Sequence, residues 1–447
     1  MYSKVTPEIV NQSVGANPVN CGSVSFTQSF FQLRRSHAMY LALLPALMLF
    51  SRGFADVTVV LTSCAFLWRS ACQGNWSWCR QRWVLLSAIL VAYLLLISAP
   101  LGYKPWESVI YSLTYLRWPL FAAALGCWLL NSRNALAVFS MAVLATLLFV
   151  VFDTFWQFVF GQDIFGVEKY DPVRLTGPMR NPIVGNLSLR LFFIGFFALA
   201  IWRQMKEPGL KLALMTVWLV LFVLFVYVTG ERMSFLLVLV ASCILSVGFF
   251  CEFPRYRNWL IAWICAIPAC IMLFSLIHTD VFERIVMATL ASIKNFSDDP
   301  YGRVFTTGFD VWKSHPFTGI GLANYADYCD VFLRTEEFNS CQRHPHNIYL
   351  HWLAETGVVG TLLFVASITA LAWQALAPVV HHKNWLLGSC ILATLFVSFW
   401  PIASSASFFN NWFGAIIWCG LGWVLAISVC FGSVNHSDIN GRVTCPC

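Results

Sequence analysis

The chain has 447 residues, of which 59% are hydrophobic and only 11% are charged. Soluble domains are about half apolar and a quarter charged, so this composition excludes an ordinary soluble protein and predicts one that crosses a membrane. We interpret the formal net charge of +7 as a determinant of membrane orientation rather than as a sign of nucleic-acid binding.

Apolar segments of helix-spanning length recur along nearly the whole chain. They follow a polar, Ser/Asn-rich tail at residues 1–36. The first two segments are short and joined by Arg52-Gly53, so a tight hairpin is an alternative to two full spans. The pattern predicts an all-α, polytopic fold of about twelve transmembrane helices, at 38–51, 54–68, 83–99, 108–130, 135–160, 183–202, 211–229, 233–251, 259–277, 347–374, 385–401 and 412–431.

The loops between these segments differ in their content of basic residues. One set of alternate short loops is rich in Lys and Arg, whereas the opposite set carries only Arg52, Lys104, Lys169, Arg174, Arg180 and Arg232. By the positive-inside rule the first set is cytoplasmic, together with both termini. The chain then divides into a cytoplasmic tail (1–36), helices 1 to 9 (37–277) with a small outer loop at 161–182, a large outer loop (278–346), helices 10 to 12 (347–431) and a cytoplasmic tail (432–447).

Arginines accumulate in the outer loops. Arg174 and Arg180 flank a tight turn at 176–178, and Arg232 lies in the next outer turn, at the start of the eighth helix. The helix dipole disfavours a cation there by about 0.3–1 kcal/mol. Adjacent Glu231 could offset that charge, so an ordinary Glu/Arg turn remains an alternative. Because guanidinium groups bind phosphate oxygens bidentately, the outer arginines predict an anionic ligand.

The large outer loop contains the segment GRVFTTGFDVWKSHP, which includes Arg303 and has an amphipathic pattern. We expect it to form a helix along the membrane interface that ends before Pro316. Cys329 and Cys341 follow in the same loop, where an oxidising environment would allow a disulfide between them. None of the 16 cysteines shows a zinc-type spacing.

The large loop ends with Arg343, His344, Pro345 and His346, directly before the tenth helix. Pro345 fits the first turn of a helix, which would place His346 and Asn347 at the N-terminal end. The helix dipole and the neighbouring arginines both disfavour an imidazolium there. We therefore expect a neutral His346 that can act as a general base.

Four ionisable residues lie inside the predicted spans: Arg117, Asp153, Arg190 and Glu355. Each lies roughly 10–14 Å below the outer end of its helix, at 1.5 Å per residue. Charges at this depth face a partner or a water-filled cavity. We expect a shared polar layer with the pairs Asp153–Arg190 and Glu355–Arg117, and a polar stripe of Asn347, His351 and Glu355 that descends into the bilayer.

Four segments together resemble the motifs of the O-antigen ligase and O-antigen polymerase superfamily: RLTGPMRNP, TGERMSF, GRVFTTGFDVWKSHPFTGIGLANY and HPHNIYLHWLAETGVVG. The resemblance covers residues 174–360 in pieces. It implies a GT-C-like glycosyltransferase in the bacterial inner membrane with its site facing the periplasm. The implied reaction transfers a glycan from undecaprenyl-diphosphate-linked O-antigen to a sugar hydroxyl of lipid A–core, among membrane lipids, without nucleic acid, metal or other cofactor.

The resemblance also implies roles for individual residues. His346 occupies the position of the catalytic histidine. Arg232 occupies that of an arginine that binds the diphosphate and assists its departure, and either Arg174 or Arg180 that of a second diphosphate-binding arginine. His344, Arg303, Arg343 and Asn347 are expected to support the site.

Three other functions remain alternatives. An O-antigen polymerase is less favoured because polymerases of this superfamily tend to have two large outer loops, whereas residues 161–182 form a small one. A protein O-oligosaccharyltransferase shares the same motif region. A transporter is least favoured, because the polar residues concentrate on one face rather than at the midplane between repeated halves.

Overall fold

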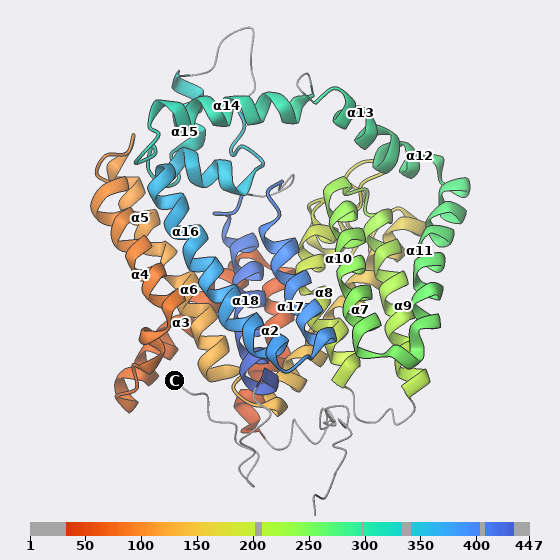
Figure 1. The fold of residues 1–447 in the computed structure, drawn as a ribbon. Coiled ribbons are helices and arrows are strands. Elements are labelled where there is room, and N and C mark those ends of the chain that lie inside the picture. The colour runs from red at the N-terminus through yellow and green to blue at the C-terminus, as the bar shows by residue number, and fades with distance from the viewer. Residues whose placement is uncertain (1–32, 202–207, 297–298, 333–340, 403–406, 433–447) are drawn as a thin grey trace, which may run out of the picture.

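The computed structural model describes residues 33–201, 208–296, 299–332, 341–402 and 407–432, and every regular element in these ranges is helical (Figure 1). The longer helices stand side by side in a bundle, and α12 to α15 lie across one end of it, which we call the loop end (Figure 1). The helices are α2 (Arg35–Phe50), α3 (Arg52–Gln73), α4 (Arg82–Tyr93), α5 (Pro105–Tyr115), α6 (Arg117–Ala124), α7 (Arg133–Phe160), α8 (Val184–Ile201), α9 (Pro208–Val228), α10 (Arg232–Glu252), α11 (Arg257–Ile277), α12 (Thr279–Phe282), α13 (Ala288–Lys294), α14 (Pro300–Ser314), α15 (Tyr325–Phe332), α16 (Ile348–His381), α17 (Trp385–Phe399) and α18 (Asn411–Gly432).

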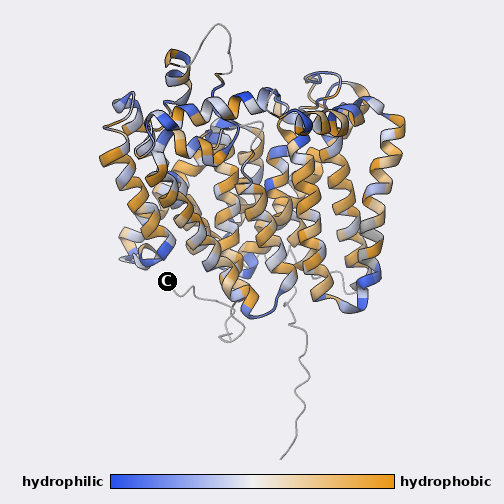
Figure 2. Cartoon of the chain, turned by 45° about the horizontal axis from the view of Figure 1, so that its top comes forward, coloured by the Kyte–Doolittle hydropathy of each residue, from blue (hydrophilic) through white to orange (hydrophobic). Residues whose placement is uncertain are grey.

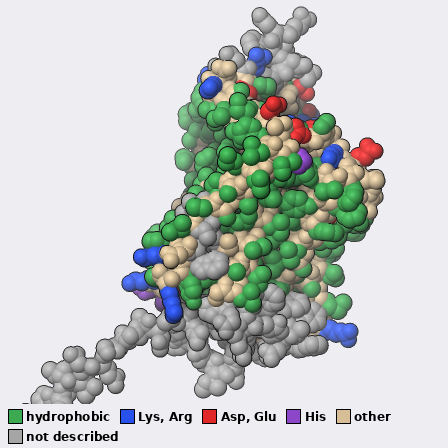
Figure 3. All heavy atoms as spheres, turned by 90° about the vertical axis from the view of Figure 1, so that its right-hand side faces the viewer, with side chains coloured by type: hydrophobic (Ala, Val, Ile, Leu, Met, Phe, Trp, Pro, Cys, Tyr) green, Lys and Arg blue, Asp and Glu red, His purple; other side chains and the backbone are tan. Residues whose placement is uncertain are grey.

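The bundle is built to cross a membrane. Within the described ranges, seven helices are long and apolar enough to do so, and a bent pair of helices at 265–294 would make an eighth. The shorter apolar helices α2, α4 and α17 occupy further predicted spans. Hydrophobic side chains cover the body of the bundle, and charged ones lie mainly towards its ends (Figures 2 and 3). The protein is therefore an all-α, multi-pass membrane protein, while the count of twelve spans stays a prediction.

The first two helices form a tight hairpin. Only Ser51 separates α2 from α3, and its side chain accepts a hydrogen bond from Phe54 N at 3.4 Å. α3 continues to Gln73, five residues beyond the predicted end at residue 68, and stops where Gly74 adopts a left-handed φ of 63°. A glycine in this conformation is a common helix C-terminus.

The large loop is mostly helical where it is described. α11 ends at Ile277, and the chain bends by 119° into the stretch Thr279–Lys294, which runs along the loop end (Figure 1). α14 then forms over the segment predicted to be an amphipathic helix, and it ends at Ser314, before Pro316. Val304 and Val311 on one side of α14 are buried, whereas the ion pair between Lys313 and Asp310 (3.3 Å) lies on its exposed side.

A break at Gly357 divides α16 into two parts, because Gly357 has a φ of 67° that no helix accommodates. The first part runs beneath α14 at the loop end, and the second descends through the bundle (Figure 1). The carbonyls of Ala354 and Glu355, next to the break, accept hydrogen bonds from Ile320 N (3.1 Å) and Gly321 N (2.9 Å). Asn347, His351 and Glu355 all precede the break, so the predicted stripe lies along the first part of α16, beneath α14, and does not descend into the bundle (Figure 1).

The expected intramembrane ion pairs are wrong. Arg117 lies 3.3 Å from Asp56, and Asp153 accepts a hydrogen bond from Ile164 N at 3.0 Å. Arg190 donates to the carbonyl of Asn186 (2.7 Å) on its own helix. Which helix faces bring charges together depends on rotation and packing, which a one-dimensional depth count cannot provide.

Candidate active site

The turn between α9 and α10 brings the small loop against the start of α10. Gly230 has a φ of 72°, and a Cβ there would overlap the carbonyl of Val173. Leu175 N donates to the carbonyl of Thr229 at 3.3 Å, which joins the two segments beside Arg174. Only glycine permits this close approach. The turn therefore places Arg174 next to the residues that precede Arg232.

Glu231 anchors this turn. Its carboxylate accepts hydrogen bonds from Gly185 N (2.7 Å) and Asn186 N (3.0 Å) at the start of α8, and from the hydroxyl of Ser234 (3.0 Å). Burial raises the pKa of the Glu231 carboxyl to about 7, and the hydrogen bonds and Arg174 oppose that rise. The sequence suggested that Glu231 offsets the charge of Arg232. It caps a different helix instead and fixes the position of the turn.

Arg284, which lies between α12 and α13, joins the two predicted arginines. Its Nε donates to the carbonyl of Gly230 at 2.9 Å. Burial, together with the like charges of Arg174 and Arg232, lowers the pKa of its guanidinium. We call Arg174, Arg232 and Arg284 the arginine cluster. Arg284 is absent from the predicted site residues, because the comparison of loop charges rests on the short loops; its position just after the ninth predicted span was a visible signal.

Tyr301 connects the arginine cluster to the histidines. The Arg232 guanidinium lies over its ring, 5.6 Å from the centroid, and the His346 ring packs edge-on against it at 5.8 Å. Arg232 is held from the other side by Ser292 Oγ, to which it donates at 3.2 Å. Asp299 fixes the start of α14 by accepting a hydrogen bond from Tyr301 N at 2.9 Å. Arg232 and His346 therefore meet on one aromatic ring, although 114 positions separate them in the printed sequence.

The histidines form a row that leads away from Tyr301. The His346 and His344 rings lie 4.3 Å apart, and the His344 and His351 rings 6.1 Å apart. His351 Nε2 then lies 3.4 Å from the carboxylate of Glu355. Burial lowers the pKa of His344 to about 2, with smaller contributions from the two other histidines. His344 is therefore neutral at physiological pH.

His346 lies just before the helix rather than in its first turn. It has a left-handed φ of 52°, which is uncommon for a residue with a side chain. Asn347 is the N-cap of α16, and its side chain accepts hydrogen bonds from Tyr349 N (3.0 Å) and Leu350 N (3.1 Å). Pro345 thus precedes the helix, contrary to the expectation, and Asn347 supports the site by fixing where α16 begins.

Glu355 organises the loop opposite the histidines. Its carboxylate accepts hydrogen bonds from Ala323 N (2.9 Å) and from Tyr325 N (3.1 Å) at the start of α15. Gly319 and Gly357 both have positive φ, and a Cβ on either would overlap the backbone of the facing segment. The turn at 318–321 is therefore a docking element for the broken helix.

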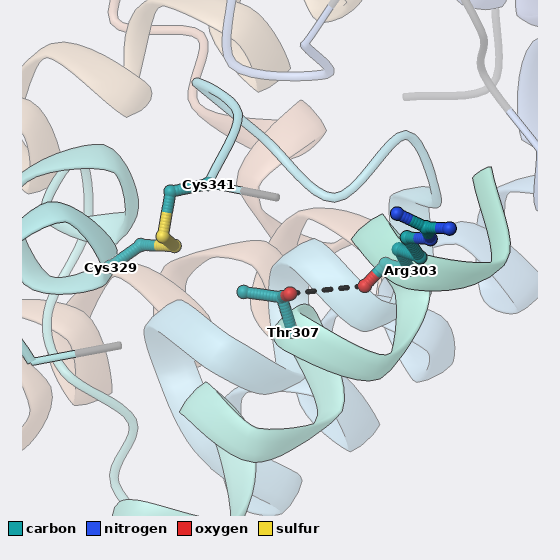
Figure 4. The surroundings of a disulfide bond; sticks show 4 residues. All are labelled: Arg303, Thr307, Cys329 and Cys341. Atoms are coloured by element: carbon teal, nitrogen blue, oxygen red, sulfur yellow. Dashed lines mark hydrogen bonds between the residues drawn. A yellow bond between two sulfur atoms is a disulfide. The ribbon is translucent and has the colours of Figure 1, made fainter. Parts of the chain in front are cut away.

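The remaining predicted residues lie elsewhere. Arg303 and Arg343 are exposed, and α14 is tied internally by the hydrogen bond from Thr307 to the carbonyl of Arg303 (3.0 Å, Figure 4). The disulfide Cys329–Cys341 closes the nearby loop (Figure 4). Arg180 lines a pocket that does not include the residues of the arginine cluster. Among the residues that the structure describes, no group of three or more His, Cys, Asp or Glu side chains could hold a metal ion.

Residues 216–365 match a family model described as O-antigen ligase. The matched region includes Arg232, Arg284, Tyr301, the three histidines of the row and Glu355. No curated protein matches the chain. A solved structure described as "Structural coordination of polymerization and crosslinking by a peptidoglycan synthase complex" aligns over 77% of this chain and 96% of its own, with a TM-score of 0.43 and 16% identity. The part of the chain at 216–365, which includes the turn between α9 and α10 and the histidine row, is similar to the O-antigen ligase family.

Proposed function

We propose that this protein transfers a glycan from undecaprenyl diphosphate to a sugar hydroxyl of lipid A–core. The observation that supports this most directly is the meeting of Arg232 and His346 on the ring of Tyr301, beside the other two members of the arginine cluster. Such a site offers cationic groups for a diphosphate and an imidazole for a hydroxyl within reach of one substrate. The match of residues 216–365 to an O-antigen ligase family model supports the same proposal.

The arginine cluster acts on the leaving group. When the bond between the anomeric carbon and the phosphate oxygen breaks, negative charge develops on the diphosphate of the lipid carrier. Fixed guanidinium groups stabilise that charge without reorganisation during the reaction. Of the two arginines left open by the sequence, Arg174 is the one that reaches the turn carrying Arg232, so we assign the second diphosphate contact to it.

His346 acts on the acceptor. Its imidazole accepts the proton of the acceptor hydroxyl while the hydroxyl oxygen forms the new bond to the anomeric carbon. The carrier departs as undecaprenyl diphosphate, and His346 releases its proton to solvent. A single displacement of this kind inverts the anomeric configuration. His344, neutral because of burial, packs against His346 without adding a positive charge that would oppose proton transfer.

The proposed reaction requires the loop end to face the periplasm from the inner membrane. The distribution of basic residues supports this orientation, because among the short loops those of the opposite end carry most of the Lys and Arg. Cysteine labelling of intact cells at positions 303 and 255 tests it. We expect position 303 to be labelled in intact cells and position 255 to be labelled only after the cells are permeabilised.

Purified protein is incubated with undecaprenyl-diphosphate glycan and lipid A–core, without added metal or ATP, and joined product is measured. His346→Ala and Arg232→Ala should each lower the initial rate by about 100-fold or more. Arg255→Ala, which removes an exposed arginine from the other end of α10, should retain the wild-type rate. Full activity in both site variants would exclude the mechanism. Product only with a second lipid-linked repeat, or only with a pilin-like protein, would identify a polymerase or a protein O-oligosaccharyltransferase.

A further inference from the structure

The small outer loop, which carries Arg174, also lines a pocket. None of the three residues of the arginine cluster lines that pocket. It has a volume of about 520 Å³ and is formed by the α2–α3 turn, the small loop at 161–182 and the start of α18. Its lining includes Arg52, Arg180, Asp163, Phe165 and Trp412. This volume falls within the range of small-molecule sites.

Two arginines give the pocket a cationic side. Arg52, the first residue of α3, lies over the Trp412 ring at 5.4 Å. The indole of Trp412 is itself fixed by a hydrogen bond to the carbonyl of Met48 at 2.8 Å. Arg180 has a left-handed φ of 60°, a conformation that costs energy for a residue with a Cβ. Neither arginine has a carboxylate within ion-pair distance among the described residues.

Asp163 gives the pocket a hydrogen-bond acceptor. The residue is only 2% exposed, and its Oδ1 accepts a hydrogen bond from Val167 N at 2.6 Å. Its Oδ2 is buried and has no hydrogen-bond partner among the described residues. A carboxylate oxygen without a donor in a pocket lining can accept a hydrogen bond from a ligand that supplies one. A sugar hydroxyl is such a donor.

The shape and chemistry of the lining favour a sugar over a lipid headgroup. A phosphate alone would gain from the two arginines but would be repelled by Asp163. A saccharide with a phosphate or carboxylate substituent uses both, because its hydroxyls donate to the carboxylate and its anionic group binds the guanidinium groups. Phe165 is 68% exposed and offers an apolar ring to the C–H face of a sugar.

We infer that this pocket binds an anionic saccharide. The inference rests on the proposed function only for the source of that saccharide, which is either the acceptor oligosaccharide or the glycan being transferred. The pocket is a binding site separate from the displacement at His346. It positions one of the two sugar chains while the arginine cluster holds the diphosphate.

Binding is measured directly, so that it does not depend on transfer activity. Protein in nanodiscs is titrated with two probes, phosphorylated core oligosaccharide released from lipid A and the repeat-unit oligosaccharide released from its carrier. One of the two should bind saturably, and that one identifies the source. Asp163→Asn keeps an oxygen for Val167 N but places an amide where the free acceptor was, and Arg180→Gln and Arg52→Gln remove the charges.

Each of the three substitutions should lower the affinity for that probe by about 10-fold or more, which corresponds to the loss of one hydrogen bond to a charged group. Arg255→Gln, which changes an arginine outside the pocket, should leave the affinity for the probe unchanged. Equal thermal unfolding midpoints show that all variants are folded. Absence of saturable binding by either probe, or affinities unchanged in all three variants, would overturn the inference. So would binding that disappears when phosphatidylglycerol is added to the nanodisc, since that identifies a lipid-headgroup site. An inactive but sugar-binding protein would refute the proposed function alone.

Discussion

Replacement of Tyr301 tests whether Arg232 and His346 act as one site. Tyr301→Leu removes the ring that both groups contact. A half-buried cation–π contact contributes about 1 kcal/mol, and an edge-on aromatic pair about 0.5–1.5 kcal/mol. The combined loss of about 1.5–2.5 kcal/mol corresponds to a roughly 10- to 70-fold lower rate if both contacts position the groups for the transition state.

Tyr301→Phe is the matched control, because it keeps the ring and removes only the hydroxyl. It should retain the wild-type rate within about twofold. Initial rates are measured in nanodiscs with both substrates saturating, and unfolding midpoints confirm that both variants are folded. The Leu variant should lose kcat more than it raises KM for the donor, since Ser292 still holds Arg232. A Leu variant as active as the Phe variant, or a Phe variant as impaired as the Leu variant, would refute this role of the ring.

Three further predictions concern residues around the site. Arg284→Gln should raise KM for the lipid-linked donor by about 10-fold, with partial recovery in Arg284→Lys, because a charge leaves the arginine cluster; an unchanged donor KM would remove Arg284 from it. The contribution of His344 to stability should fall by about 1.4 kcal/mol per pH unit below pH 6.5, because the unfolded state then binds a proton that folded His344, with its pKa lowered to about 2, does not. Glu231, with its pKa raised to about 7, contributes with the opposite sign over the same range, so the measured quantity is the difference between wild type and His344→Gln. Their slopes of unfolding free energy against pH between 6.5 and 5 should differ by about that amount, and equal slopes would contradict it. Glu355→Gln leaves one of the N–H groups of Ala323 and Tyr325 without its acceptor and should lower the free energy of unfolding by about 1–3 kcal/mol, whereas an unchanged unfolding midpoint would contradict that assignment.

Apolar patterning predicted most of the fold. Each predicted span corresponds to a helix or a broken helix, and the amphipathic segment from Gly302 forms α14 within a few residues. Helix ends were less accurate where local chemistry decides them. α3 extends to Gln73, where the left-handed Gly74 ends it. Pro345, expected in the first turn of α16, precedes the helix because the Asn347 side chain caps it at Ile348. These boundaries depend on side-chain hydrogen bonds that hydropathy does not encode.

The residue types of the candidate site and the side of the membrane on which they lie could be predicted from the sequence. The contacts among these residues could not. The outer arginines and histidines were visible, whereas nothing in the sequence showed that Tyr301 lies between Arg232 and His346. The choice between Arg174 and Arg180 also required the structure, because a tight turn separates them: Arg174 lies against the turn that precedes Arg232, whereas Arg180 lines a pocket that does not include the arginine cluster. Glu355 was assigned to an ion pair because the break at Gly357, and the segment that docks there, could not be foreseen.

The exchange of hydrogen bonds at Gly357 has a consequence for the order in which the protein is made. The N–H groups of Ile320 and Gly321 find their acceptors only at Ala354 and Glu355, and Val358 N finds its own at the carbonyl of Pro316. A nascent chain that has emerged only as far as the early 320s therefore lacks the acceptors of these N–H groups, although the carbonyls of Ile320 and Leu322 can already accept hydrogen bonds from Tyr103 N and the Ser108 hydroxyl. Completion of the tenth span during biosynthesis must coincide with its docking, and insertion of that span is coupled to maturation of the loop before it.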